Sequence, residues 1–233
     1  MVDAAASALL PDPGRVTTPT PPATLHLTAW VLPGRQVLHR VHRDAYRGDG
    51  FNPGVAGNAR FSPIRDAKGD PVPILYAAAS FAAAAMETVF HDVSHAPGFK
   101  HYSQRKLEDQ VHSQVRVVRK LKLADLGSVA LRKLGVQRRQ LIDTEKDQYP
   151  RTRLWAQAIH AQRRDIQGLA WISRQDDSAR AVMLFGDRLP AGSLRQVGNS
   201  RSLLHDEQAY AELLELADRI GVDIAPGSDG KPA

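Results

Sequence analysis

The sequence contains no cysteine and no long apolar run. The lack of cysteine excludes disulfide bonds and thiolate metal sites. No segment approaches the roughly 18 consecutive apolar residues of a membrane-spanning helix. The N-terminal stretch AAASALL is short and lacks the basic flank of a secretion signal. We therefore expect a cytoplasmic protein that does not associate with a membrane.

Basic residues exceed acidic ones, giving the chain of 233 residues a formal net charge of +6. Such an excess favours a polyanion or an acidic protein as a partner. Much of it lies between residues 100 and 164, spread over several expected elements. That distribution is more typical of solvated faces than of a nucleic-acid footprint. A basic nucleic-acid-binding module stays open as an alternative function.

Residues 1–23 are rich in alanine, proline and threonine and lack periodicity, which predicts a disordered leader. Residues 24–233 are expected to form one domain, because 42% of the chain is hydrophobic and can bury a sizeable core. Strands and helices intermix without strict alternation, which favours an α+β fold with a mixed sheet flanked by helices. The expected strands are 37–41, 74–78, an edge-like 111–123, 168–173 and 179–185, and the expected helices are 80–93, 128–136, 149–164 and 205–220.

Glycine is concentrated in residues 48–57, GDGFNPGVAG, which indicates an irregular loop able to approach a ligand closely. The segment is not a dinucleotide-binding fingerprint, since the required strand and helix are missing, and no phosphate-binding GxxxxGK[ST] loop occurs. Tyr46 stands just before this loop. It is either a pocket residue or an ordinary exposed tyrosine.

The most informative residue is Glu87, a lone carboxylate in the apolar run SFAAAAMETVF. An ionised carboxylate is rarely buried without a partner. The expected helix begins after Ser80 as N-cap and places Glu87 two turns in. Upstream, Arg40 in VLHRV and Arg60 in NARFSP are guanidinium groups among apolar neighbours. The three charges suggest a pocket for an anionic, sugar-bearing ligand, and the alternative is a buried structural ion pair.

A metal site was considered at His91 and His95, which are four residues apart. Two histidines at this spacing on one helix can hold a metal ion. The chain has no HExxH motif, however, and the helix is expected to end near residue 93. We therefore expect a solvated pair and no metal site.

The ordered set of these motifs resembles the RES domain family, toxins of bacterial toxin–antitoxin pairs named for an arginine, a glutamate and a serine. The similarity covers residues 37–185. The matching pieces are the RV dipeptide at Arg40, ARFSP at Arg60, LYAA with Tyr76, then Glu87, and finally WISR with Ser173. The family often has tryptophan where Phe61 stands.

The resemblance implies a fold related to ADP-ribosyltransferases and consumption of NAD+ by hydrolysis, phosphorolysis or transfer of ADP-ribose. NAD+ would be a substrate, not a cofactor. The implied roles are the pyrophosphate or ribose for Arg40 and Arg60, the nicotinamide for Tyr76, the nicotinamide ribose for Glu87, and completion of the pocket for Ser173. The implied partner is an Xre-type helix-turn-helix antitoxin, so that DNA would be reached only through the antitoxin. A catalytically inactive relative that acts by partner binding is a further alternative.

These residue types suit cleavage of the nicotinamide–ribose bond. Positive charge develops at the anomeric carbon, and a fixed carboxylate such as Glu87 stabilises it. The planar fork of an arginine makes paired, charge-assisted hydrogen bonds to a diphosphate. Tyr76 offers a flat face, although a tyrosine in a buried strand can also be plain core. Ser173 has no assignable activating base, so it is a pocket donor or a simple strand-terminal serine rather than a nucleophile.

Overall fold

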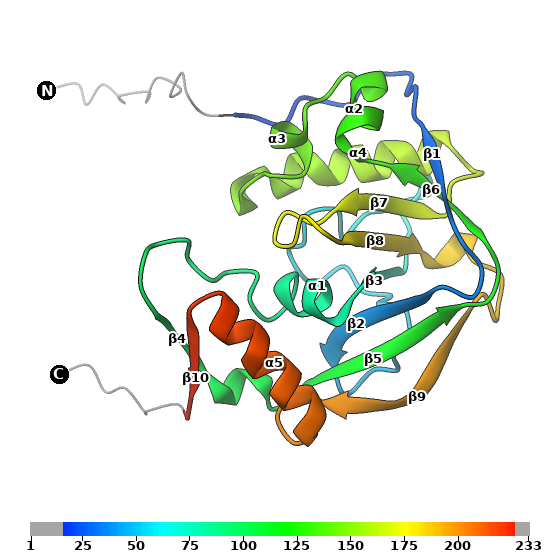
Figure 1. Ribbon diagram of the computed structural model, residues 1–233. Helices are drawn as coiled ribbons and strands as arrows, with labels where there is room; N and C mark the ends of the chain where they lie inside the picture. Colours follow the sequence, from blue (N-terminus) through cyan, green and yellow to red (C-terminus); the bar gives the residue numbers. More distant parts are fainter. Residues whose placement is uncertain (1–15, 227–233) are drawn as a thin grey trace, which may run out of the picture.

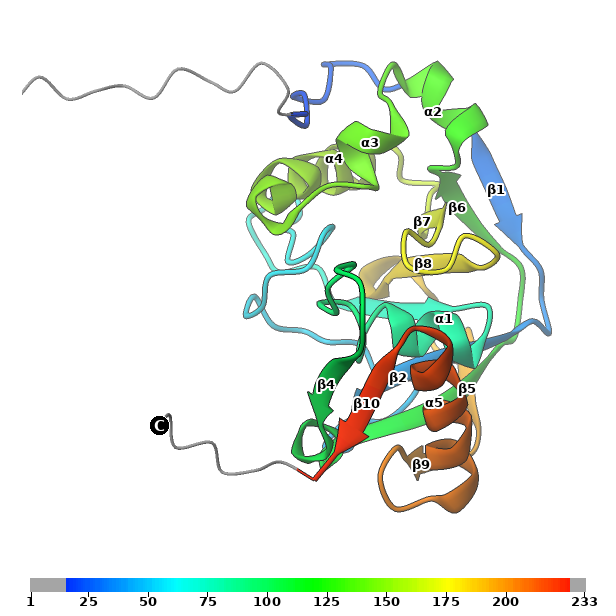
Figure 2. The same ribbon diagram turned by 60° about the vertical axis from the view of Figure 1, so that its left-hand side comes forward.

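A curled sheet of eight strands forms the centre of the protein (Figure 1). The structure is a computed structural model that describes residues 16–226. The strands of this sheet are β1 (Ala29–Leu32), β2 (Val37–Arg43), β3 (Ile74–Ala78), β5 (Gln110–Val117), β6 (Leu121–Asp125), β7 (Gly168–Ile172), β8 (Arg180–Phe185) and β9 (Leu194–Ser202). Their order is β1-β6-β7-β8-β3-β2-β5-β9, and only β6 and β7 run parallel. β4 (Lys100–Ser103) and β10 (Val222–Ala225) form a separate parallel pair beside the large sheet (Figure 2).

The helices gather in two groups against the sheet (Figures 1 and 2). The α-helices are α1 (Phe81–Met86), α2 (Ser128–Leu134), α3 (Arg138–Leu141), α4 (Tyr149–Gln162) and α5 (Glu207–Arg219), and the 3-10 turns are η1 (Gln104–Leu107), η2 (Lys146–Gln148) and η3 (Gly186–Arg188). α2 and α4 share a hydrophobic cluster with β7 and β8, in which Trp155 and Trp171 are buried. α1 and α5 share a second cluster with Val41 of β2. The expected α+β class with a mixed sheet and flanking helices is confirmed.

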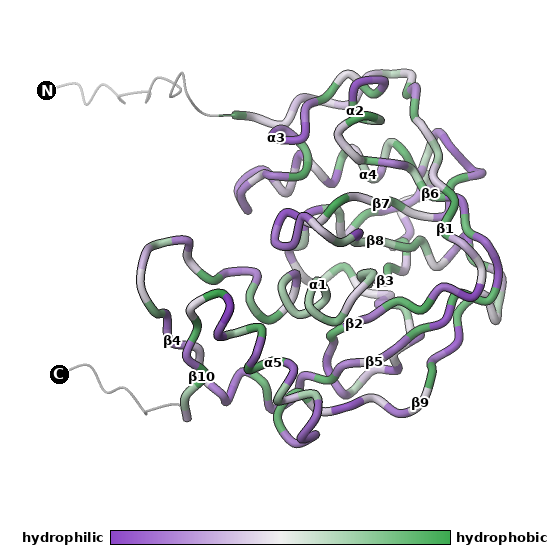
Figure 3. The backbone as a smooth tube through the Cα atoms, in the orientation of Figure 1, coloured by the Kyte–Doolittle hydropathy of each residue, from purple (hydrophilic) through white to green (hydrophobic). Residues whose placement is uncertain are grey.

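Alanine-rich α1 packs closely because its side chains are small. Ala83, Ala84 and Ala85 are buried, and α1 and β3 are largely hydrophobic in Figure 3. The hydroxyl of Ser80 accepts a hydrogen bond from the amide of Ala83 at 3.1 Å, as expected for the N-cap. The helix ends at Met86, however, and Glu87 is its C-cap. The prediction of a helix to residue 93 with Glu87 in its interior was therefore wrong.

The sheet has a seam between β2 and β3. Only one residue pair, His39 with Ala78, is in register across it, whereas all seven residues of β2 pair with β5. Since side chains alternate along a strand, Val41, Tyr76 and Ala78 face the α1 side. Arg40 faces the opposite side. The two halves of the sheet therefore part beside Val41 and Tyr76.

The end of the expected disordered leader is in fact packed against the helices. Residues 1–15 lie outside the described part of the chain, but Thr18 is fully buried. Its amide donates to the side-chain oxygen of Gln148 at 3.0 Å, and the indole of Trp155 donates to the carbonyl of Pro19 at 2.7 Å. The prediction was wrong for residues 16–23, because the proline-rich backbone supplies hydrogen-bonding groups to η2 and α4.

The expectation of an edge-like strand at residues 111–123 needs correction. Residues 111–123 hold most of β5 and the start of β6, and both strands lie inside the sheet rather than at an edge. The last helix begins at Glu207 after Asp206 as N-cap, close to the expected residue 205. Within residues 16–226, no helix has the length and hydrophobicity needed to cross a bilayer.

Candidate active site

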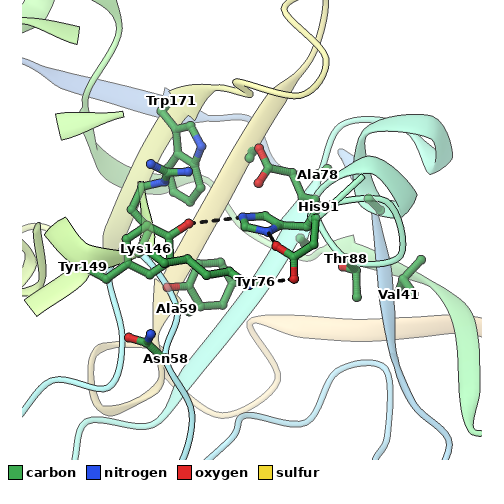
Figure 4. A pocket seen from close by; sticks show the side chains of 16 residues that line it. Val41, Asn58, Ala59, Tyr76, Ala78, Thr88, His91, Lys146, Tyr149 and Trp171 are labelled. Atoms are coloured by element: carbon green, nitrogen blue, oxygen red, sulfur yellow. Dashed lines mark hydrogen bonds and ion pairs between the residues drawn. The ribbon is translucent and has the colours of Figure 1, made fainter. Parts of the chain in front are cut away.

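A cavity of about 350 Å³ opens at the seam of the sheet, a size suited to part of a small-molecule ligand (Figure 4). Its lining comes from both halves of the sheet, from the end of α1 and from the start of α4. Of the predicted site residues, Arg60, Tyr76 and Glu87 line it. These three residues, up to 27 positions apart in the sequence, thus meet around one space.

Glu87 is held by Ser173, which directly follows β7. The serine hydroxyl donates to Oε1 of Glu87 at 2.6 Å. The same hydroxyl oxygen accepts from the backbone amides of Gln175 and Asp176, both at 3.0 Å. Because those amides supply the oxygen with two donors, its own proton is directed at the carboxylate. Ser173 is fully buried and orients Glu87 without displacing it from the cavity wall.

Among the described residues, Glu87 forms no ion pair, so the closed structural pair considered from the sequence is not present there. Arg60 is buried and uses Nη1 to donate to the Thr144 hydroxyl at 3.0 Å and to the carbonyl of Ile142. Its guanidinium lies 5.2 Å from the ring centre of Tyr149. Burial lowers the pKa of Arg60, and the Glu87 carboxylate acts in the opposite direction. Arg60 therefore contributes positive potential to the cavity without neutralising the glutamate.

One end of the cavity is aromatic. The rings of Tyr76 and Trp171 meet edge to face, with centroids 6.3 Å apart. The Tyr76 hydroxyl donates to Ser62 at 3.2 Å, and burial raises the pKa of Tyr76 to about 12, so the phenol stays protonated. Tyr76 packs against the hydrophobic core and also lines the cavity.

Arg40 does not belong to this cavity, and the expectation that it joins the other residues was wrong. Its Nη1 donates to the carbonyls of Gly48 at 2.9 Å and Gly50 at 2.6 Å, on the opposite face of β2. Burial lowers the pKa of Arg40 to about 10, partly offset by Asp49. Arg40 does lie among apolar residues, as the sequence indicated. Because side chains alternate along β2, however, its guanidinium points to the face opposite the cavity.

The glycine-rich loop and Tyr46 also differ from expectation. Tyr46 is 56% exposed and does not line the cavity. Gly48 and Gly50 close over Arg40 instead of approaching a ligand. Gly48 is required there, because a Cβ atom at this position would lie 2.5 Å from that of Ser113. Only Asn58 and Ala59, just after the loop, reach the cavity wall.

The sequence did not reveal a row of polar residues at the mouth of the cavity. The hydroxyl of Tyr149 lies 3.2 Å from Nε2 of His91, and Nδ1 of His91 lies 2.7 Å from Asp92. Lys146 donates to the other oxygen of Asp92 at 2.6 Å. His91 was noted only as a possible metal ligand with His95. Among residues 16–226, no group of three or more side chains of the kinds that ligate metals is clustered.

A second hollow of about 580 Å³ adjoins the first and shares its four mouth residues. Those shared residues are His91, Asp92, Lys146 and Tyr149. Arg174 and Gln175 line its other side. The side chain of Arg174 is 17% exposed, and its Nη1 donates to the carbonyl of Thr144 at 2.5 Å. The two hollows form one cleft with an aromatic inner end and a charged outer end.

The RES domain family model matches residues 37–206. A search of the curated proteins found no match. The matched range contains Arg60, Tyr76, Glu87 and Ser173 and every strand of the large sheet except β1. The curled mixed sheet with few helices is consistent with an ADP-ribosyltransferase-like fold. The chain therefore belongs to the RES domain family, which is associated with NAD-targeting toxins of toxin–antitoxin systems.

Proposed function

We propose that this protein cleaves the nicotinamide–ribose bond of NAD+ and acts as the toxin of a toxin–antitoxin pair. Family membership supports the substrate class. The observation that carries the proposal is the carboxylate of Glu87, which lines the cavity, is oriented by Ser173 and forms no ion pair within the described residues. An oriented anion of this kind is the group that a developing sugar cation requires.

The shape of the cleft suggests how NAD+ is bound. The nicotinamide fits the aromatic inner end beside Tyr76 and Trp171, where its flat pyridinium ring meets aromatic side chains that also favour a cation. The nicotinamide ribose then lies beside Glu87. The diphosphate extends toward the outer hollow, where Arg174 and Lys146 can bind it in exchange for their ion pairs with Glu145 and Asp92. Arg174 takes the place that the sequence had assigned to Arg40.

The proposed chemistry needs little from the protein besides charge stabilisation. When the bond breaks, its electron pair stays on the nicotinamide nitrogen, and the pyridinium becomes a neutral ring that leaves without protonation. The ribose carbon becomes oxocarbenium-like and is stabilised by Glu87. Arg60 binds the anionic part of the substrate and keeps its distance from the carboxylate, because it is already anchored to Thr144. NAD+ is consumed, and no cofactor is required.

The proposed setting is the bacterial cytoplasm, where NAD+ is available. An Xre-type helix-turn-helix antitoxin holds the toxin in check, and DNA is contacted through that antitoxin. The net charge of +6 is suited to an acidic protein partner. Co-expression with such an antitoxin should relieve the growth arrest caused by this chain alone.

The direct test is nicotinamide release from NAD+ by the purified protein. We expect turnover by the wild type and a loss of about 10²-fold or more in Glu87→Gln, which keeps the shape but removes the charge. Thermal unfolding of both proteins controls for folding. Chromatography of the second product separates ADP-ribose from a phosphorylated or protein-linked form. An active Glu87→Gln variant would contradict the assigned role, and an inactive wild type that still binds the antitoxin would indicate a catalytically dead relative.

A second candidate function, binding of nucleic acid, is favoured by one basic surface feature. Arg35, Arg116 and Arg195 surround a separate hollow of about 520 Å³, and Arg116 and Arg195 face each other across β5 and β9. Like charges directly opposite each other are unfavourable unless an anion lies between them. Salt-sensitive DNA or RNA binding that is lost in Arg116→Glu, in a wild type without NAD+ turnover, would support this function.

A further inference from the structure

The mouth of the cavity carries a continuous chain of hydrogen bonds that the proposed bond cleavage does not use. It runs from the Tyr149 hydroxyl to His91, from His91 to Asp92, and from Asp92 to Lys146, with separations of 3.2, 2.7 and 2.6 Å. In Figure 4, His91 lies across from Tyr149 and Lys146, and a dashed line joins it to the hydroxyl of Tyr149. All four residues line the inner cavity and the outer hollow, so the chain borders the route of the ligand.

The partners of His91 determine which ring nitrogen is free to accept a proton. Hydrogen bonds from Lys146 and His91 hold the pKa of Asp92 below its usual range, so Asp92 is a carboxylate. A carboxylate only accepts, and therefore Nδ1 of His91 carries the hydrogen. Nε2 is then a lone pair, and the Tyr149 hydroxyl donates to it. A histidine oriented by a carboxylate, with its other nitrogen toward a ligand space, has the arrangement of a general base.

Attack of water on the sugar cation, the second half of the proposed reaction, requires a proton acceptor in addition to Glu87. A water molecule that attacks the sugar cation must lose a proton as its oxygen bonds to the anomeric carbon. Glu87 accepts a hydrogen bond from Ser173 and is assigned to the cation itself, so its charge is needed throughout the step. A separate base beside the same cavity would remove the proton without neutralising that carboxylate.

We propose that His91 is the general base that deprotonates the attacking water, which accepts the ADP-ribosyl group. The water proton reaches His91 through the hydroxyl of Tyr149. As the water oxygen bonds to the anomeric carbon, one water proton passes to the Tyr149 oxygen. The original phenolic proton passes to Nε2 of His91, and nicotinamide leaves with the electron pair of the broken bond. NAD+ and water thus give ADP-ribose, nicotinamide and one proton, which the imidazolium later releases to solvent. This inference rests on the proposed function.

The role of His91 as a base gives the expected pH dependence. The titratable or charged residues that line one or both hollows with His91 are Arg60, Tyr76, Glu87, Asp92, His95, Glu145, Lys146, Asp147, Tyr149 and Arg174. Since the base must be neutral to act, the rate of nicotinamide release should fall toward acid pH as the ring takes up a proton.

The test uses the purified full chain with NAD+ as substrate and His91→Gln as the main variant. We expect nicotinamide release to fall about 10²-fold or more, and the acid limb of the pH–rate profile to disappear. Azide is an anionic nucleophile that has no proton to lose. It should therefore restore nicotinamide release in His91→Gln and form an azide adduct of ADP-ribose. Binding of NAD+, measured by calorimetry, should stay within about threefold of the wild type.

Two variants and a control guard against a purely structural effect. Tyr149→Phe keeps the ring under Arg60 and removes only the hydroxyl, and Asp92→Asn keeps the shape and removes the orienting charge. Both should slow turnover, and the effects of Tyr149→Phe and His91→Gln should not add, because they interrupt one relay. His101→Gln is the matched control. Its side chain is 83% exposed and lies outside both hollows, so turnover should be unchanged.

The outcomes separate this inference from the function on which it rests. An active wild type whose His91→Gln variant keeps the same rate and acid limb would overturn the assignment of His91 alone. Loss of rate without rescue by azide, together with lost NAD+ binding, would also overturn it and make His91 a structural residue. A wild type that releases no nicotinamide would instead remove the proposed function itself, and the inference with it.

Discussion

The two sides of β2 hold buried arginine in contrasting ways. On the cavity side, Arg60 is anchored through Nη1 to Thr144 and Ile142 and lies in a cavity wall near Glu87. On the other side, Arg40 donates to the carbonyls of Gly48 and Gly50 under a closed loop. Both looked alike in the sequence, as a guanidinium among apolar residues. What distinguishes a binding residue from a structural one is whether it borders a space that a ligand can enter.

The largest difference between the two sides of β2 should be seen in the catalytic activity of Arg60→Met. Removing this charge takes away an electrostatic contact with the anionic substrate, and we expect kcat/KM for NAD+ cleavage to fall about 10²-fold to 10³-fold. Steady-state kinetics would measure it. Because Arg60 also anchors residues 142–144, thermal unfolding should be followed in parallel, and the rate should be expressed per folded protein. Near wild-type kinetics would place Arg60 with Arg40 as a structural residue.

Loss of the hydroxyl in Ser173→Ala should have the next largest effect. The carboxylate of Glu87 keeps its charge but loses the 2.6 Å bond that orients it. We expect kcat to fall about tenfold to 10²-fold with little change in KM, since an oriented charge acts mainly on the transition state. Ser178→Ala, in the same turn, is the matched control. A change confined to KM would indicate instead that Ser173 contacts the bound substrate.

A smaller effect is expected from Arg174→Gln at the outer hollow. If Arg174 contacts the diphosphate, its loss removes a charge-assisted hydrogen bond worth about 1.5–3 kcal/mol, which corresponds to roughly a tenfold rise in KM or more. The value of kcat should change little, because the contact is made equally before and during bond cleavage. Rising salt should reproduce part of the effect in the wild type. An unchanged KM would place the diphosphate elsewhere in the cleft.

The smallest effect on catalysis should come from Arg40→Met, although the protein should become less stable. The carbonyls of Gly48 and Gly50 lose their donor, at a cost of about 1–3 kcal/mol in the free energy of unfolding. Denaturant titration would measure this loss, and the kinetics per folded molecule should match the wild type. A large fall in kcat with unchanged stability would reverse the comparison between the two arginines.

Local features could be predicted from the sequence because they depend on neighbouring residues. The N-cap at Ser80, helix α4 after Pro150 and the strands at LYAA and GLAWI follow from capping and hydrophobic pattern. That Ser173 lies near Glu87 was expected from family resemblance, since nothing local links residues 86 positions apart, but the hydrogen bond between them was not predicted. The early end of α1 was missed because the apolar pattern continues past Met86.

Features that depend on long-range packing could not be predicted. Strand alternation placed Arg40 on the same face of β2 as Leu38. Which face of β2 borders the cavity, however, depends on where α1 packs. The contact of His91 with Tyr149 joins residues 58 positions apart and has no local pattern. Thr18 and Pro19 resemble a disordered leader until the surface of α4 and its neighbours provides partners for their backbone.

The seam between β2 and β3 has a mechanical consequence. With a single registered pair, His39 and Ala78, the two halves of the sheet have little backbone hydrogen bonding to join them. A ligand bound beside Val41 and Tyr76 would contact residues from both halves of the sheet. Binding of a ligand in the cavity should therefore stabilise the two halves of the sheet against separation. The unfolding temperature should rise with ligand concentration, so the ligand also contributes to the stability of the fold.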